Sequence, residues 1–320
     1  MEKVSIIIPF KDLDDYTNIC LKKCLDLEYD NFEIILLPDN NIEALNLTVN
    51  KKDKKKIKII PTSAVKPSVK RNIGVKNSSG DVYAFLDSDA YPDKRWLDIA
   101  INYLKDNSVG IAGGPSITPD EDSEKQKASG EILGSFIGAG RASLRYKAKG
   151  LQEVNELPSC NLFVKKQIFE LAFGFDSSFL TAEDAKLCFS CRNASKKVLY
   201  VPELFVYHHR RELFWPHIKQ MFVYARDKAQ LIKEDFDFGK MYYFLPMLFT
   251  LFLVSGSAIS IFSEFFRQFF IITLVFYISI VFLSSVFISF KRFYLIFFGI
   301  IATHLSYGVG SLYGLLGKKA

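Results

Sequence analysis

Short apolar runs recur along the first 200 residues, and each run ends in polar or turn-forming residues. Val4–Pro9, Phe32–Leu37 and Val82–Leu86 are continuous enough to be strands buried on both faces of a sheet. Between them, the apolar residues of 14–27 and 96–104 recur at helical spacing. This alternation predicts an α/β fold with a mostly parallel sheet and helices on both sides. Further elements are expected at 57–60, 70–76, 109–112, 162–164 and 198–201.

The pattern changes after residue 240. Residues 242–263 and 268–290 contain no charge, and 293–317 contain only His304 as a possible charge. Each stretch is long enough to cross about 30 Å of hydrocarbon as a helix. Three such runs in succession are unlike the buried helices of a soluble core. The sequence therefore predicts a domain at 1–240 followed by a membrane domain of two or three helices at 241–320.

Two segments are harder to assign. Residues 120–150 are polar and rich in small residues, which is typical of a mobile loop or loose helix over a site. Residues 210–240 form a juxtamembrane segment, in which aromatic side chains alternate with Arg and Lys between 210 and 238. That mixture fits a helix lying at a membrane surface, and it fits a core-packed linker helix equally well.

The charge is not that of a nucleic-acid-binding protein. Of the net +6, the membrane domain accounts for +4, because five basic residues there face one acid (Arg267, Lys291, Arg292, Lys318 and Lys319 against Glu264). The first 240 residues therefore carry about +2, with no basic recognition element. No signal peptide precedes the first strand, and five cysteines suit a reducing compartment. We expect a multi-pass cell-membrane protein with its first domain on the cytoplasmic face.

The number of crossings stays open at this level. Three crossings place Lys291-Arg292 inside, as the positive-inside rule prefers, but leave Lys318-Lys319 outside, against that rule. If the last segment is bent or interfacial, two crossings remain.

The candidate chemistry begins at Asp87-Ser88-Asp89, where the apolar run Val82–Leu86 ends in two carboxylates. The carboxyl ends of strands in open α/β sheets are where ligands bind. Carboxylates there commonly hold Mg²⁺ or Mn²⁺ together with substrate phosphates. An Asp-x-Asp turn alone is common on protein surfaces, so the other motifs decide its meaning.

Several motifs in order resemble the family 2 glycosyltransferases with a GT-A fold, over roughly residues 3–230. These motifs are Val4-Ser5-Ile6-Ile7-Ile8-Pro9-Phe10, Lys70-Arg71-Asn72-Ile73-Gly74, Phe85-Leu86-Asp87-Ser88-Asp89, Pro158-Ser159-Cys160-Asn161-Leu162-Phe163, Phe173-Gly174-Phe175-Asp176, Thr181-Ala182-Glu183-Asp184 and Val206-Tyr207-His208-His209.

The resemblance implies a site for a nucleotide-sugar donor and a Mg²⁺ or Mn²⁺ ion. The implied donor-binding residues are Pro9, Phe10, Asp39, Arg71 and Asp87, and the implied metal ligands are Asp89, Asp87 and His209. For Arg71, a structural salt bridge to the loop carboxylates is the competing interpretation. For the histidines at 208 and 209, the competing interpretation is a buried ring that is hydrogen-bonded to a backbone carbonyl.

The resemblance also implies that Asp184 is the general base for the acceptor hydroxyl, with Glu183 beside it. Two adjacent, partly buried acids raise each other's proton affinity, which suits a base. The competing interpretation is that both acids simply begin a helix, since acids favour helix N-termini. In-line attack in such a site inverts the anomeric centre.

Two departures from the family pattern bear on function. Proline occupies the first acidic place in Pro38-Asp39, which leaves the nucleotide undetermined, and no Q-x-x-R-W motif of processive synthases is present. We therefore expect transfer of one sugar to a lipid-linked or cell-surface glycan acceptor near membrane lipids. A nucleotidyltransferase is disfavoured because the Ser5–Asp14 segment lacks a Gly-rich phosphate loop. A catalytically silent scaffold is disfavoured by the acids at 87, 89 and 184.

Overall fold

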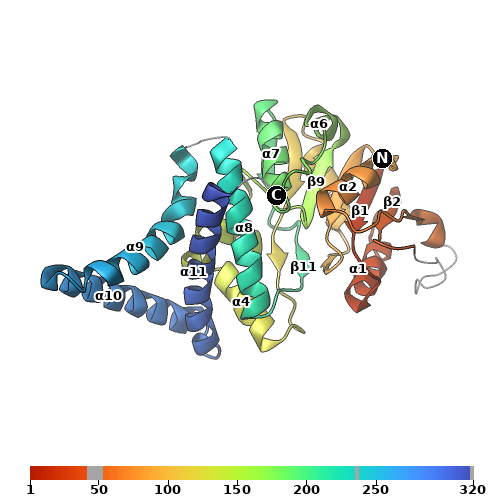
Figure 1. Cartoon of the computed structure of the whole chain (residues 1–320). Coiled ribbons are helices and arrows are strands. Elements are labelled where there is room, and N and C mark those ends of the chain that lie inside the picture. The colour runs from red at the N-terminus through yellow and green to blue at the C-terminus, as the bar shows by residue number, and fades with distance from the viewer. Residues whose placement is uncertain (42–52, 235–237, 318–320) are drawn as a thin grey trace. The chain divides into compact units, whose positions relative to one another are not determined.

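The computed structural model of the chain describes residues 1–41, 53–234 and 238–317. These residues form two compact units (Figure 1). The α/β unit comprises Met1–Ile117 and Leu144–His209, and the helical unit comprises Thr118–Ser143 and Arg210–Ala320. These units differ from the division expected at residue 240, because residues 118–143 and 210–240 belong with the C-terminal helices. Lys318-Lys319 lie outside the described residues.

An eight-stranded sheet of order β3-β2-β1-β4-β9-β6-β10-β8 organises the α/β unit. Strands β3, β2, β1 and β4 are parallel, while β9 runs antiparallel between β4 and β6. A second sheet has the order β5-β11-β7. The strands are β1 (Val4–Pro9), β2 (Phe32–Leu37), β3 (Ile57–Ile59), β4 (Val82–Leu86), β5 (Ala90–Pro92), β6 (Val109–Gly113), β7 (Ser116–Ile117), β8 (Gln152–Glu153), β9 (Asn161–Lys165), β10 (Lys197–Tyr200) and β11 (Val206–His208). The predicted mostly parallel α/β fold is confirmed.

The sheet is buried on both faces, as its continuous apolar strands require. Every residue of β1 and of β4 is buried. Along β1, Ile6 and Ile8 pack with Leu21 and Trp96 on one face, while Ile7 packs on the other.

The helices and 3₁₀ turns of the described residues are α1 (Asp15–Leu25), η2 (Asp53–Lys56), α2 (Pro67–Lys76), α3 (Trp96–Leu104), α4 (Glu124–Leu133), α5 (Phe136–Ala139), η3 (Gly140–Tyr146), α6 (Lys166–Leu171), α7 (Glu183–Asn193), α8 (Trp215–Glu234), η4 (Phe238–Phe244), α9 (Leu245–Ile259), α10 (Glu264–Ile288) and α11 (Phe293–Leu316).

The segment predicted as a mobile loop or loose helix contains the ordered helix α4. Ser123 and Gln126 form a capping box at its start, which satisfies backbone donors of the first turn. Ala128 and Ile132 are buried together with Ile296 and Ile300 of α11 in one apolar cluster. These partners on α11 lie more than 160 residues away in sequence, so the helical character of α4 is not visible locally.

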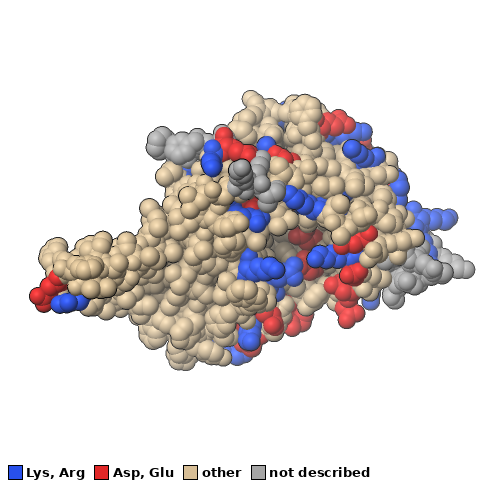
Figure 2. All heavy atoms as spheres, in the orientation of Figure 1, with Lys and Arg blue, Asp and Glu red and all other residues tan. Residues whose placement is uncertain are grey.

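Three helices are long and apolar enough to cross a membrane, namely Lys240–Ile259, Glu264–Ile288 and Phe293–Leu316. The protein is therefore membrane-associated. On the face shown in Figure 2, α9 and α10 carry almost no charged atoms except at their shared tip. The helices differ in burial, because 50% of the most apolar window of α11 is buried against 11% for α10.

The buried face of α11 lies along α8. Ser306 Oγ donates to the carbonyl oxygen of Ile218 at 2.6 Å, and Lys233 Nζ donates to that of Leu315 at 3.1 Å. The helices approach closely at Gly310, where an added Cβ would lie 2.4 Å from the carbonyl oxygen of Phe222. One face of α8 is therefore covered by α11, and this packing is compatible with a position of the helix pair at a membrane surface.

Candidate active site

Asp87 and Asp89 lie at the carboxyl end of β4, as the sequence predicts. Both belong to the turn that joins β4 to β5, and Ala90 N donates to Asp87 O at 3.0 Å to close this turn. Because β4 is buried between β1 and β9, the turn is held at the edge of a rigid sheet. The two carboxylates are therefore positioned by the sheet and not by a free loop.

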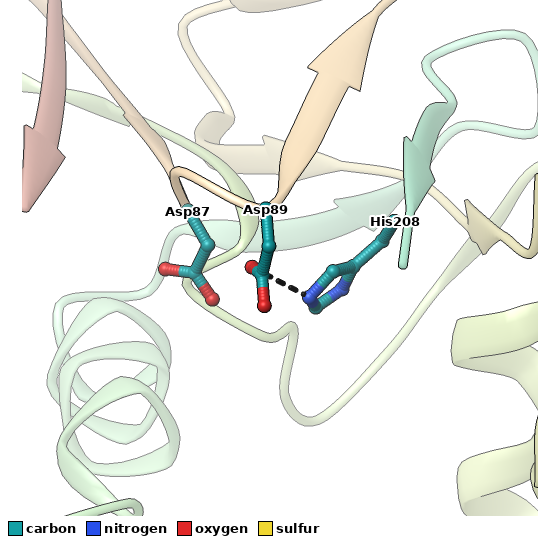
Figure 3. Close-up of side chains that lie close together, drawn as sticks. All are labelled: Asp87, Asp89 and His208. Carbon is teal, nitrogen blue, oxygen red and sulfur yellow. Dashed lines mark hydrogen bonds and ion pairs between the residues drawn. The ribbon is translucent and has the colours of Figure 1, made fainter. Parts of the chain in front are cut away.

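His208 completes a group of three side chains that could hold a metal ion. The ligand atoms of Asp87, Asp89 and His208 all lie within 4.8 Å of one another (Figure 3). His208 Nε2 lies 3.1 Å from Asp89 Oδ1. Burial lowers the pKa of His208, but the charge of Asp89 outweighs this effect and raises the pKa to about 10. Two carboxylates and an imidazole are a donor set that divalent Mn²⁺ or Mg²⁺ accepts.

His209, which the sequence analysis assigned to the metal, lies outside this group of three. Its backbone nitrogen donates to Asp89 O at 3.0 Å, and its ring centroid lies 4.2 Å from that of Tyr16. The pairing of β11 with β5 places His208 opposite Ala90 and so beside the acidic turn. That register is a long-range property, and the two adjacent histidines look alike without it.

Arg71 joins the acidic turn to the start of α7. Its Nη2 donates to Asp87 Oδ1 at 2.7 Å, and its Nη1 donates to Glu183 Oε1 at 2.8 Å. Burial lowers the pKa of Arg71, but the charges of Asp87 and Glu183 raise it above its ordinary value. Helix α2 comes close enough for this contact because residue 74 is glycine, where a Cβ would lie 2.7 Å from Ile7 Cγ2. The salt bridge weighed against a donor-binding role for Arg71 is therefore present.

Glu183 and Asp184 form the first turn of α7 and differ in environment. Glu183 is buried, and burial together with the charge of Asp184 raises its pKa above the usual range of a carboxyl, although Arg71 opposes the shift. Asp184 is half-buried, and its carboxylate accepts from Ser159 N at 3.1 Å and from Ala185 N at 2.7 Å. Glu183 therefore has the raised proton affinity expected of a buried acid in such a pair.

Two buried polar atoms of this cluster lack a hydrogen-bond partner among the described residues. They are Arg71 Nε and Glu183 Oε2. An unpartnered polar atom in a protein interior is costly and calls for an explanation. A bound polar substrate group would supply one.

Pro9 is the last residue of β1, Phe10 follows it, and Asp39 lies two residues after the end of the neighbouring strand β2. Phe10 N donates to Leu37 O at 3.1 Å, which holds the two strand ends together. The Asp39 carboxylate forms an ion pair with the buried ammonium of Lys70 on α2. Sequence reasoning gave Lys70 no role, because its burial between the ends of β1 and β2 depends on contacts between distant segments.

The fold is that of the GT-A type glycosyltransferases. Residues 5–170 match the model of glycosyl transferase family 2, which covers more than half of the chain. The chain therefore belongs to glycosyltransferase family 2.

Individual relatives agree with this family. An uncharacterized glycosyltransferase of Haemophilus influenzae is 32% identical over 118 residues, covering 36% of this chain and 47% of that protein. The pre-mycofactocin glycosyltransferase of Mycobacterium tuberculosis is 28% identical over 148 residues, covering 46% of this chain and 31% of that protein. The matched region thus spans less than half the length of these relatives.

Among solved structures, the mannosyltransferase PcManGT from Pyrobaculum calidifontis, in complex with GDP-Man and Mn²⁺, has a TM-score of 0.67 at 11% identity. The alignment covers 98% of this chain and 87% of that one. S. aureus TarS has a TM-score of 0.50 at 14% identity, covering 78% of this chain and 43% of that one. These likenesses concern the fold.

Proposed function

We propose that the protein is an inverting glycosyltransferase that moves one sugar from a nucleotide-diphosphate donor to a lipid-linked or cell-surface glycan acceptor. The main support for this proposal is that Arg71 forms two ion pairs. One guanidinium contacts both the acidic turn at Asp87 and the acid pair at Glu183. A group suited to bind a diphosphate and a group suited to take a proton are thereby neighbours.

On the donor side, Asp87, Asp89 and His208 would hold a divalent ion, which when bound neutralises charge on the departing diphosphate. Geometry favours His208 over His209 for this role, since His208 lies within the group of three. Arg71 adds a permanent positive charge, and its Nε is available to a substrate oxygen. Pro9, Phe10 and Asp39 would contact the nucleoside.

On the acceptor side, Asp184 is the proposed general base. It takes the proton of the acceptor hydroxyl while the acceptor oxygen bonds to the anomeric carbon, and the bond from that carbon to the diphosphate oxygen breaks. Backbone donors from Ser159 and Ala185 hold its carboxylate in place. Glu183 is held by Arg71 and acts as a positioning residue. Attack opposite the leaving group inverts the anomeric configuration.

We further propose two membrane crossings, α9 and α10, with α11 remaining at the membrane surface. The helix alongside α11 carries six charged residues in twenty, namely Lys219, Arg226, Asp227, Lys228, Lys233 and Glu234. Charged side chains are expensive in the hydrocarbon core, so the α8–α11 pair suits the interface. Arg292 pairs with Glu131 of α4, and Lys291 lies 3.1 Å from Glu124 of the same helix. Because α4 is covalently joined at both ends to the α/β unit, we assign the α10–α11 connection to the cytoplasmic side.

The test is an assay of the full chain in lipid nanodiscs with a panel of nucleotide sugars, Mn²⁺ and lipid-linked acceptors. We expect a product of inverted configuration by NMR, and a loss of turnover by roughly 10²–10⁴-fold in Asp184→Asn, the usual worth of a general base. Asparagine keeps one acceptor oxygen for the two backbone donors of Ser159 and Ala185, so the melting temperature should fall only slightly. A product of retained configuration, or near-normal turnover in Asp184→Asn, would refute the mechanism.

A further inference from the structure

Lys70 places a fully buried ammonium group between the ends of β1 and β2. The residue is 3% exposed. Its Nζ donates to Phe10 O at 2.5 Å, to Leu37 O at 3.2 Å and to Asp39 Oδ1. A lysine ammonium has three N–H donors, so these three acceptors saturate it. Lys70 is therefore engaged by the protein itself and has no donor left for a diphosphate.

The consequence for Asp39 is that its two carboxylate oxygens are no longer equivalent. Oδ1 takes a charged hydrogen bond from Lys70. Within residues 1–41, 53–234 and 238–317, no other side chain or backbone group donates to this carboxylate. The Asp39 side chain is 15% exposed. Its second oxygen, Oδ2, thus has no donor among these residues.

We propose that Lys70 is a positioning residue that sets the base specificity of the donor site toward uracil or thymine. This inference rests on the proposed function. Uracil and thymine carry a single imide N–H, which one carboxylate oxygen satisfies. Guanine presents two adjacent donors, N1–H and the 2-amino group, which pair best with both oxygens of a carboxylate. With Oδ1 bonded to Lys70, the second guanine donor competes with a charge-assisted bond.

The binding test measures UDP, dTDP and GDP by calorimetry on the full chain in nanodiscs with Mn²⁺. We expect UDP or dTDP to bind at least about tenfold more tightly than GDP, the worth of one hydrogen bond to a charged group. The comparison of UDP with dTDP separates uracil from thymine as the preferred base. Equal or tighter binding of GDP overturns the base assignment and leaves the transferase proposal standing. If none of the three diphosphates binds, the base assignment fails, and the panel of nucleotide sugars tests the transferase proposal separately.

Two variants separate positioning from a merely structural role. Asp39→Asn keeps an oxygen for Lys70 but replaces the acceptor Oδ2 with a donor. This variant should bind UDP about tenfold more weakly than wild type does, and it should bind CDP more tightly, because cytosine has an acceptor at the same place. Lys70→Met frees Asp39, so the ratio of UDP affinity to GDP affinity should fall toward one.

The matched control is Lys3→Met, which removes a lysine before β1 that contacts Ser79 and Glu33. It should leave the ratio unchanged. If the Lys70→Met variant does not fold, the binding data for Asp39→Asn alone test the inference on base specificity. An unchanged order of base preference in Asp39→Asn would overturn the inference.

Discussion

Arg71 donates to Glu183 across 112 residues of sequence, with both side chains buried and the atoms 2.8 Å apart. Removing one partner of a buried ion pair costs about 3–5 kcal/mol, because the other charge is left without compensation. Arg71 also holds Asp87, so one side chain fixes the distance between the two halves of the site. Its planar fork suits two carboxylates at once, which a lysine ammonium matches less well.

Arg71→Lys should therefore reduce turnover by roughly 10²-fold, since misplacement by about 1 Å has this effect. Steady-state kinetics of the full chain would measure it. Arg145→Lys is the matched control, because Arg145 donates from Nη2 to one carboxylate oxygen of Glu156, and we expect a small effect there. Wild-type turnover in Arg71→Lys would show that the two ion pairs do not organise catalysis.

Metal binding should distinguish the two adjacent histidines. His208→Ala removes one donor of the group of three and should weaken Mn²⁺ binding by roughly 10–100-fold, the size of effect seen even for outer-shell groups. His209→Ala is the matched control and should change Mn²⁺ affinity little. Titration followed by electron paramagnetic resonance gives both numbers. The reverse order of effects would restore the assignment made from sequence.

His217 should make the helical unit sensitive to acid. Its ring lies fully buried between Ser129 Oγ and Thr303 Oγ1, at 2.8 Å from each, and burial lowers its pKa to about 4. Between pH 6.5 and 4 the unfolded chain binds a proton that the folded chain does not, so stability falls as pH falls through this window. At pH 5 the loss is about 2 kcal/mol.

The matching measurement compares the melting temperatures of wild type and His217→Gln from pH 7.5 to 4.5. Glutamine bonds both hydroxyls without titrating, so the difference between the two proteins should shrink or reverse as the solution is acidified. Parallel curves would show that His217 does not contribute to the acid sensitivity.

Membrane topology is testable with reporter fusions. Two crossings place a reporter after Phe262, between α9 and α10, outside, and a reporter at the C-terminus inside. An external signal from the C-terminal fusion would establish that α11 crosses the membrane and that the α8–α11 pair separates or inserts.

Local sequence was sufficient where burial is continuous. The bounds of β1, β2 and β4 agree with the apolar runs, because a strand covered on both faces needs an apolar side chain at nearly every position. The acidic turn at Asp87 was predictable for the same reason, since it is the point where such a run stops.

What was missed depends on contacts between distant segments. Helix α4 owes its buried face to α11, His208 owes its place to the register of β11, and Lys70 owes its burial to the ends of β1 and β2. None of these partners is within the reach of a local pattern.

The packing of α4 against α11 has a practical consequence for isolating the enzyme. Ala128, Ile132 and Leu213 share one apolar cluster with Ile296 and Ile300. Ending the chain at residue 240 would remove Ile296 and Ile300 and expose the apolar side chains of this cluster that remain on the fragment. Such a fragment should bind detergent or aggregate, although it contains no membrane-crossing helix. A soluble form is better designed by deleting only the α9–α10 hairpin and joining α11 to the preceding chain.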